Sequence, residues 1–312
     1  MQKYKAVVAV GVLAIMVAVA GIPGPQHALY FPISIYDIGP CGYSTKKGLA
    51  YSYPANMSNQ VKDALCISDG AYWRLWQYTV PRHIFQSLTY LPNIWGLPQT
   101  QSFQTWYNPD LEYDLVLIGN ECDQADQCNQ PPDVVASMFI DVLNTCQSCM
   151  AVAPGLASDE TDGTWLLQWY YSFIDQGGDI DRIYAWDAHQ YVDITHAIPE
   201  WILNQCPDDA CIARTEITRR INNIYNVMPV YKPMLISEVG MCNLPNTYEW
   251  FSAVLDTLEK DDRVLAYMVF IDNNVGQPWQ PCNFPIYNAN NTLNSYGLAI
   301  RHATTTPQTP YP

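Results

Sequence analysis

Short apolar segments with the composition of buried strands alternate with helix-like segments along this chain, and this alternation constrains its fold more than any other feature. It is typical of parallel β/α units, in which each helix returns the chain to the start of the next strand. We predict eight strands, near residues 47–53, 72–78, 88–95, 113–120, 150–155, 182–189, 233–238 and 264–271. Eight units in 312 residues predict a single α/β domain, a (β/α)8 TIM barrel.

Helical periodicity between these strands is clearest near residues 134–143, 217–224 and 251–258. Residues 79–112 differ, because four prolines interrupt any helical pattern there. We therefore expect a weak or missing third helix, together with loops stapled by disulfides. The Thr/Pro-rich end, residues 304–312, is expected to be disordered.

The first 28 residues have the composition of an export signal. Lys3 and Lys5 precede an uncharged apolar run over residues 6–20, and small residues and prolines follow it. We expect residues 1–28 to be a signal peptide and processing region, and residues 29–303 to be the folded domain of a secreted protein. After signal cleavage no stable membrane insertion is expected; the alternative is an uncleaved N-terminal anchor that leaves the domain outside.

Ten cysteines follow the apolar run, and an even number in an exported chain indicates disulfides. The short spacings predict that Cys122 pairs with Cys128 and that Cys206 pairs with Cys211.

Two further cysteine pairs need separate arguments. Cys146 and Cys149 have the spacing of a redox motif, but they lie at the end of an amphipathic helix rather than at its start, so we expect a structural bridge. The alternative hypothesis of an exported disulfide-handling protein rests on this pair alone. Cys242 and Cys282 follow the last two predicted strands, whose loops are neighbours in a barrel, and we expect them to pair.

The charge balance excludes some partners. Fifteen Lys and Arg against thirty Asp and Glu give a net charge of −15, which repels nucleic acid and anionic membranes. The chain is rich in aromatic residues, with 10 Trp and 22 Tyr, and flat rings with polar edges suit the C–H faces of neutral sugars, although aromatic residues fill cores more often than they line clefts.

Two glutamates stand at the ends of strand-like apolar runs. Asn120 and Glu121 end the fourth run, and Glu238 ends the seventh. Side chains at the C-terminal ends of barrel strands converge on one mouth, so the two carboxylates are expected to face each other. A pair of carboxyl groups, one acid and one ionised, is what the hydrolysis of a glycosidic bond requires. The alternative is that each is a surface residue at a strand end.

The sixth predicted strand adds two polar candidates. His189 and Tyr191 lie on the same side of an extended chain, where one could bond the nucleophile and the other the sugar. Asn120 could bond a sugar hydroxyl beside the reacting carbon. A strand-end His is also often a satisfied core residue.

Seven short motifs occur in a fixed order over roughly residues 46–300. They are KKGLAY at 46–51, LPNIWG at 91–96, IGNECD at 118–123, APG at 153–155, AHQY at 188–191, LISEVG at 235–240 and TLNSYG at 292–297. Together they resemble the glycosyl hydrolase catalytic-core family that includes glycoside hydrolase family 128, the retaining β-1,3-glucanases of clan A.

The resemblance implies Glu121 as acid/base and Glu238 as nucleophile. Cys122 stands where the family has Pro, Gln190 where it has Trp, and Phe270 closes an eighth strand where it has a Trp floor. The candidate substrate-binding residues are Asn120, His189, Tyr191, Trp95, Trp76, Phe270 and Trp279.

The function predicted from the sequence is that of a secreted retaining glycoside hydrolase acting on a β-glucan, with a β-1,3-linked polymer and endo-type cleavage favoured. The alternative is a non-catalytic carbohydrate-binding protein on the same barrel. Because the sequence has no His-Glu-x-x-His motif and no phosphate-binding Gly-rich loop, we expect no metal and no cofactor. The partner expected is a polysaccharide or oligosaccharide, bound by a monomer.

Overall fold

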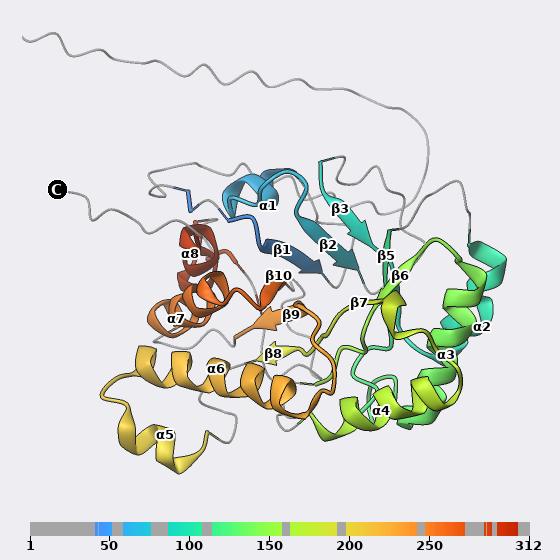
Figure 1. Ribbon diagram of the computed structural model, residues 1–312. Coiled ribbons are helices and arrows are strands. Elements are labelled where there is room, and N and C mark those ends of the chain that lie inside the picture. Colours follow the sequence, from blue (N-terminus) through green and yellow to red (C-terminus); the bar gives the residue numbers. More distant parts are fainter. Residues whose placement is uncertain are drawn as a thin grey trace, which may run out of the picture. The chain divides into compact units, whose positions relative to one another are not determined.

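The structure is a computed structural model, shown in Figure 1. It describes residues 41–42, 44–51, 59–75, 87–107, 114–157, 163–191, 198–241, 247–271, 284, 286–288 and 292–304, all of them within the unit Ile33–Pro312. The expected signal region 1–28, residues 305–312 of the tail, Trp76, Trp279 and the expected Cys242–Cys282 pair lie outside the described residues.

All eight predicted strands are present, two of them in two pieces. The strands are β1 (Lys47–Tyr51), β2 (Tyr72–Leu75), β3 (Thr89–Leu91), β4 (Asn93–Ile94), β5 (Leu115–Ile118), β6 (Met150–Val152), β7 (Ile183–Ala185), β8 (Gln190–Tyr191), β9 (Met234–Gly240) and β10 (Val264–Ile271). The helices are α1 (Asn59–Ala64), α2 (Leu97–Trp106), α3 (Pro132–Thr145), α4 (Thr164–Asp175), α5 (Glu200–Gln205), α6 (Asp209–Val227), α7 (Thr247–Lys260) and α8 (Ser295–His302).

Every pair of neighbouring strands is parallel, as the alternation predicted. Among the described residues the pairs make two sheets, a six-stranded one in the order β3-β2-β1-β10-β9-β8 and a four-stranded one in the order β4-β5-β6-β7. The fold is therefore α/β with parallel sheets, and the strand pairs do not form one continuous ring within the described ranges.

The chain passes directly from one sheet to the other at both edges. Pro92 separates β3 from β4, and its carbonyl accepts a hydrogen bond of 2.9 Å from Leu117 N of β5. Residues 186–189 separate β7 from β8; there Trp186 makes a parallel bridge to Met234 of β9. The sixth predicted strand is thus interrupted: Trp186 bridges to β9, and residues 187–189 lie outside the named strands before β8 begins.

The helix expected to be weak or missing is present as α2, which has ten residues. Pro98 lies in its first turn, where a missing N–H costs nothing because the first four N–H groups of a helix have no partner within it. Pro92 falls between strands, so only one described proline of this segment touches the helix at all. The expected absence of this helix is therefore wrong, and α2 is longer than α1, α5 and α8.

The helices lie against the sheets with their apolar faces inward. In α3 the buried residues recur at helical spacing, including Val135, Phe139 and Val142, and α6 and α7 show the same pattern. Figure 1 shows α6, α7 and α8 beside β9, β10 and β1, with α3 and α4 beside the four-stranded sheet. Trp73, Trp169, Trp186 and Trp250 are buried in the core rather than in a cleft.

Four disulfides link described residues. Cys122–Cys128, Cys206–Cys211 and Cys146–Cys149 confirm the sequence predictions. A fourth, between Cys41 and Cys66, was not predicted, because its partners lie 25 residues apart and the spacing gave no signal. Within the described ranges, no helix combines the length and the apolar character needed to cross a bilayer.

Lys47 is a fully buried lysine on β1. Its ammonium donates hydrogen bonds to the carbonyls of Ile300 at 2.8 Å, Ala303 at 3.3 Å and Gly42 at 3.4 Å, and so closes the C-terminal end of α8 onto the first strand. Burial lowers the pKa of Lys47 to about 7, against the raising effect of the Glu259 charge.

This lysine should make stability depend on pH. Between pH 7 and the usual lysine pKa of 10.5, the unfolded chain keeps a proton at Lys47 that the folded chain has released, so the free energy of unfolding should rise with pH. The slope from this group is at most about 1.4 kcal/mol per pH unit. Urea unfolding of the parent and of Lys47→Met at several pH values in this window should show the slope only in the parent. Lys260→Met, at an exposed position, controls for the lost charge, and equal slopes in the parent and Lys47→Met would contradict the prediction.

Candidate active site

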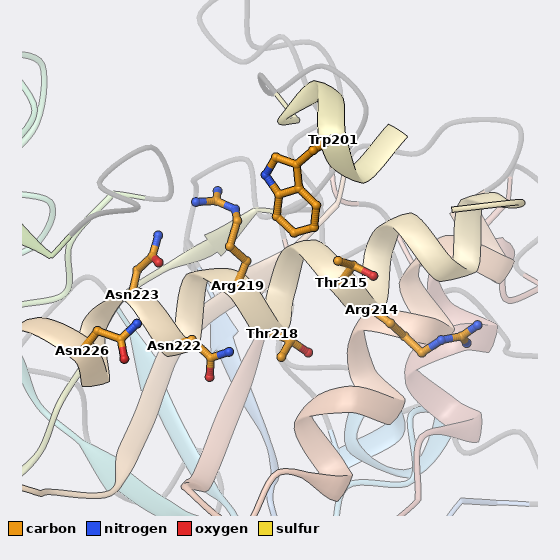
Figure 2. Close-up of a pocket in the computed structure, with 8 residues that line it drawn as sticks. All are labelled: Trp201, Arg214, Thr215, Thr218, Arg219, Asn222, Asn223 and Asn226. Atoms are coloured by element: carbon orange, nitrogen blue, oxygen red, sulfur yellow. The ribbon is translucent and has the colours of Figure 1, made fainter. Parts of the chain in front are cut away.

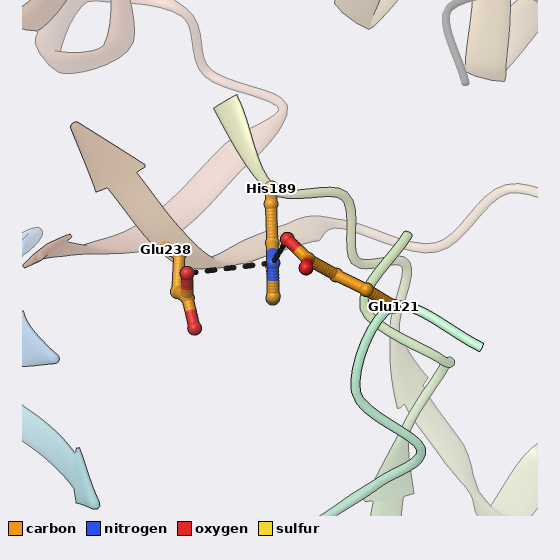
Figure 3. A group of neighbouring side chains, drawn as sticks. All are labelled: Glu121, His189 and Glu238. Carbon is orange, nitrogen blue, oxygen red and sulfur yellow. Dashed lines mark hydrogen bonds and ion pairs between the residues drawn. The ribbon is translucent and has the colours of Figure 1, made fainter. Parts of the chain in front are cut away.

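The polar side chains that the sequence singled out meet at the C-terminal ends of the strands. Figure 3 shows Glu121, His189 and Glu238 pointing toward one another from three separate segments. The contributing residues are Arg74 on β2, Asn120 and Glu121 after β5, His189 between β7 and β8, Tyr191 on β8, and Ser237 and Glu238 on β9.

Glu238 is held by a cation and a phenol. Its side chain is only 3% exposed, and it forms an ion pair with the buried guanidinium of Arg74. The hydroxyl of Tyr191 donates a hydrogen bond to the other carboxylate oxygen, Oε2. Tyr191 pairs with Gly240 across the sheet, where a Cβ would lie 2.7 Å from the tyrosine ring, so the glycine permits this approach. These contacts favour an ionised Glu238.

Glu121 is the more accessible carboxylate, with 16% of its side chain exposed. Its backbone is in the left-handed region, with φ of 46°, and its N–H donates to the carbonyl of Gly155 at 2.7 Å. The next residue, Cys122, is joined to Cys128, whose N–H donates to the carbonyl of Asn120 at 3.2 Å. The stapled loop therefore fixes a backbone that a glutamate rarely adopts.

His189 lies between the two carboxylates and is fully buried. Its Nδ1 is 2.7 Å from Glu121 Oε1 and 3.5 Å from Glu238 Oε2, and its Nε2 is 3.1 Å from Ser237 Oγ. Gly155 makes room for the ring, since a Cβ there would lie 2.7 Å from Nε2. One oxygen of Glu121 and one of Glu238 lie within 4.8 Å of each other.

Arg74 connects the site and was missed in the sequence. Its guanidinium donates to Asn120 Oδ1 and to Ser237 Oγ, each at 3.4 Å, besides its ion pair with Glu238. Burial lowers the pKa of Arg74 to about 10, and the charge of Asp187 is the largest influence that raises it. A charged residue within an otherwise apolar predicted strand was the signal that could have found it.

Asp187 contacts the same network through the backbone of Ser237. It is buried, and its Oδ1 accepts a hydrogen bond of 2.8 Å from the backbone N–H of Ser237. Burial raises the pKa of Asp187, while the His189 charge, hydrogen bonds from Ser237 and the Arg74 charge work in the other direction. The polar Asp187 inside a strand-like run was a second signal that could have been used.

The pKa of Glu121 reflects opposing influences. Burial is the largest and raises it, but the hydrogen bond from His189, the charge of His189 and the charge of Arg74 together hold the pKa of Glu121 below its usual value. The free site is therefore arranged to keep Glu121 ionised near neutral pH.

Glu121, His189 and Glu238 could also offer one ligand atom each to a metal ion. The ion pair between Glu238 and Arg74 argues against this use, because a guanidinium already neutralises the carboxylate that a metal would need. The donor set therefore fits acid/base chemistry better than a metal centre.

The aromatic candidates differ in how close they lie to the carboxylates. Phe270 of β10 lies beside Tyr191, with ring centroids 6.1 Å apart, and Phe284 packs on both. Trp95 follows β4, is partly exposed, and accepts a hydrogen bond of 3.0 Å from Asn120 N at its carbonyl. Trp76 and Trp279 lie outside the described residues.

The fold and the carboxylate pair together define a class of protein. The family model described as glycosyl hydrolase catalytic core matches residues 48–299. The chain therefore belongs to the glycosyl hydrolase catalytic core family and is a glycoside hydrolase by class. No curated protein sequence matches the chain.

Solved structures share this fold. An endo-β-1,3-glucanase of glycoside hydrolase family 128, subgroup I, from Amycolatopsis mediterranei, in complex with laminaritriose, is 19% identical with a TM-score of 0.58; the match covers 83% of this chain and 100% of that one. A subgroup VI exo-β-1,3-glucanase from Aureobasidium namibiae is 15% identical with a TM-score of 0.56, covering 84% and 98%. A subgroup VII oligosaccharide-binding protein from Trichoderma gamsii is 17% identical with a TM-score of 0.57, covering 82% and 93%.

Removing the imidazole should raise the pKa of Glu121. His189→Phe deletes both the hydrogen bond and the charge that lower it, which leaves burial as the main influence. Carboxyl ¹³C shifts of labelled glutamate, followed as a function of pH, should show the Glu121 resonance titrating at higher pH than in the parent. Tyr191→Phe is the matched control because its lost hydroxyl contacts Glu238. A pKa in His189→Phe equal to or below that of the parent would refute the assigned cause.

Proposed function

We propose that this chain is an exported retaining glycoside hydrolase that cleaves a β-glucan, with β-1,3 linkages as its preferred target. The observation that carries the proposal is the short separation of two differently held carboxylates. Oxygens of Glu121 and Glu238 lie within 4.8 Å of each other. Retaining enzymes hold their carboxyl groups about 5–5.5 Å apart, whereas inverting enzymes need about 6.5–9.5 Å to admit a water.

Glu238 has the surroundings of a nucleophile. The Arg74 cation and the Tyr191 hydroxyl stabilise its anion, and its burial keeps competing water away. Attack of a Glu238 oxygen on the anomeric carbon forms the glycosyl-enzyme bond as the glycosidic bond breaks. Water later replaces the glutamate at the same carbon, and two inversions give net retention.

Glu121 is assigned as the acid/base, since it is the carboxylate that reaches solvent. It gives a proton to the leaving oxygen in the first step and takes one from water in the second. Because the pKa of Glu121 in the free enzyme is lowered, only a minor fraction of this carboxyl group is protonated near neutral pH. The decline of kcat/KM with rising pH should therefore occur at acidic pH. A bound sugar covers the exposed part of Glu121 and strengthens the burial that raises its pKa.

The substrate class is supported by the similar structures. Two are named β-1,3-glucanases, one endo and one exo, and one of these was solved with laminaritriose. Endo-type cleavage is the form we propose. In this chain the rings of Phe270 and Phe284 pack on Tyr191, whose hydroxyl binds Glu238, so an aromatic cluster adjoins the proposed nucleophile.

We also propose that the two parallel sheets are the two parts of one (β/α)8 barrel. In support, β3 and β4 are separated by Pro92 alone, and the hydrogen bonds between Trp186 and the start of β9 connect the other edges. Export is supported by the four disulfides, which persist in oxidising compartments. That the protein acts as a monomer stays a prediction.

A second candidate is a non-catalytic oligosaccharide-binding protein. It is favoured by the similar Trichoderma gamsii protein and by the lowered pKa of Glu121, which works against its service as an acid. The two candidates differ in turnover, not in binding.

Glu121→Gln and Glu238→Gln should each abolish glucan hydrolysis while the fold persists. Loss of a general acid costs about 10²- to 10⁴-fold in rate, and loss of the nucleophile prevents the intermediate altogether. An aryl glucoside with a leaving group that needs no proton should therefore retain more activity with Glu121→Gln than with Glu238→Gln.

Azide should restore turnover of the aryl glucoside by a Glu121→Ala variant and give a β-glycosyl azide. Proton NMR of the first-formed product reports its anomeric configuration. An inverted anomer, or glucan hydrolysis at the parent rate in both Gln variants, would overturn the assignment. A parent protein that binds laminarihexaose but turns over neither substrate is a binding protein.

The mature chain should begin between about residue 21 and residue 29, where small residues and prolines end the apolar run. Intact-mass and N-terminal peptide measurements on secreted protein test this directly. Retention of Lys3 and Lys5 would indicate the anchored alternative.

A further inference from the structure

A groove of about 490 Å³ lies along α6 and is lined by none of the residues of the candidate active site; Figure 2 shows its lining. Its floor is a helix face of three asparagine amides, two threonine hydroxyls and two arginine side chains, and the indole of Trp201 on α5 lies over this face. Trp201 is 47% exposed, which is unusual for a ring of this size. Nothing in the proposed mechanism uses these residues.

The groove is distinct from the active site because it lies on the face of α6 that points away from the core. The face of α6 that packs inward is formed by residues such as Ile217, Ile221 and Ile224. The groove is lined instead by residues such as Thr218 and Asn226, which lie on the solvent side. The strand ends that carry Glu121 and Glu238 contribute no lining residue.

The helix that carries Trp201 is held near α6 by a disulfide and a polar contact. Cys206, the residue after α5, is disulfide-bonded to Cys211 in the first turn of α6. The sulfur of Cys206 also lies 3.5 Å from Thr215 Oγ1 on the groove floor. This staple fixes the short helix that carries Trp201 above α6 and lowers the entropy cost of presenting the ring to a ligand.

The chemistry of the lining selects an uncharged polar ligand. No carboxylate lines the groove as described, although acidic residues outnumber basic ones two to one in the chain. Arg219 forms an ion pair with Glu216, with contacts of 2.8 and 2.7 Å, and shares this carboxylate with Arg220. The amide of Asn222 is oriented by a hydrogen bond of 2.8 Å that its Oδ1 accepts from Arg263.

We propose that this groove is a second, non-catalytic binding site for a neutral glucan chain, with Trp201 as its stacking platform. A sugar ring presents C–H groups to a flat indole and hydroxyls at its edge to amides and hydroxyl groups. That the glycan is a β-glucan rests on the proposed function. A site of this kind holds the polymer on the enzyme between cleavage events and raises the effective concentration of chain at the active site.

Other occupants fit less well. A protein partner needs an apolar core to its interface, whereas the floor here is polar and one aromatic ring is the main apolar surface. A polyanion is disfavoured by the net charge of −15 of the chain and by the ion pair that Glu216 makes with Arg219, one of the two arginines of the lining.

The test measures retention on insoluble β-1,3-glucan, with Glu121→Gln as the background so that the polymer is not consumed. Adding Trp201→Ala should weaken polymer binding about tenfold, the scale of one aromatic contact. Asn226→Ala, which removes an amide from the lining at an exposed position, should weaken it as well. Tyr171→Ala, which removes an aromatic ring of similar exposure from α4, is the matched control and should bind like the background.

Three outcomes overturn the groove proposal. They are binding by Trp201→Ala equal to that of the background, equal losses in Trp201→Ala and Tyr171→Ala, or retention that disappears in salt, which indicates non-specific electrostatic adsorption. Circular dichroism of each variant separates loss of binding from loss of fold. A parent protein that hydrolyses no glucan, but whose polymer binding depends on Trp201, supports the groove and refutes the proposed function. Hydrolysis by the parent with Trp201-independent binding does the reverse.

Discussion

The ion pair between Arg74 and Glu238 is the interaction on which the site depends. Both side chains are buried, and taking two charges out of water costs several kcal/mol per ion unless hydrogen bonds compensate. Asn120, Ser237 and Tyr191 supply those bonds from three different strands or strand ends. Loss of either partner would leave a buried charge uncompensated, which costs about 3–5 kcal/mol. The same contacts connect the strands that carry the catalytic candidates.

Much of the fold could be predicted from the sequence because its determinants are local. Buried strands and helical periodicity can be recognised in short stretches of sequence. All eight strands and the helices α3, α6 and α7 follow from these local patterns. The meeting of Glu121, His189, Tyr191 and Glu238 follows from one topological rule, that the ends of parallel strands share an edge. Local pattern and a single global rule therefore suffice to bring these four side chains together.

What could not be predicted depends on contacts between distant residues. Arg74 is one charge on an apolar strand until Asn120 and Ser237 are brought beside it. The Cys41–Cys66 bridge depends on where residue 41 lies relative to α1, which spacing does not encode. The break of the sixth strand after Ala185 arises because His189 must turn toward Glu121 while Trp186 bonds to β9. In each case tertiary contacts overrode or completed a local signal.

The left-handed backbone at Glu121 has a consequence for substitution at this position. A residue with a Cβ in that conformation costs about 1–2 kcal/mol, which glycine would not incur. A glycine at this position would remove that cost, but it would also remove the hydrogen bond between Glu121 and His189. The backbone strain and the side-chain contact of Glu121 therefore act on stability in opposite directions. Any substitution of Glu121 therefore changes the backbone of the stapled loop and the hydrogen-bond network of the site at the same time.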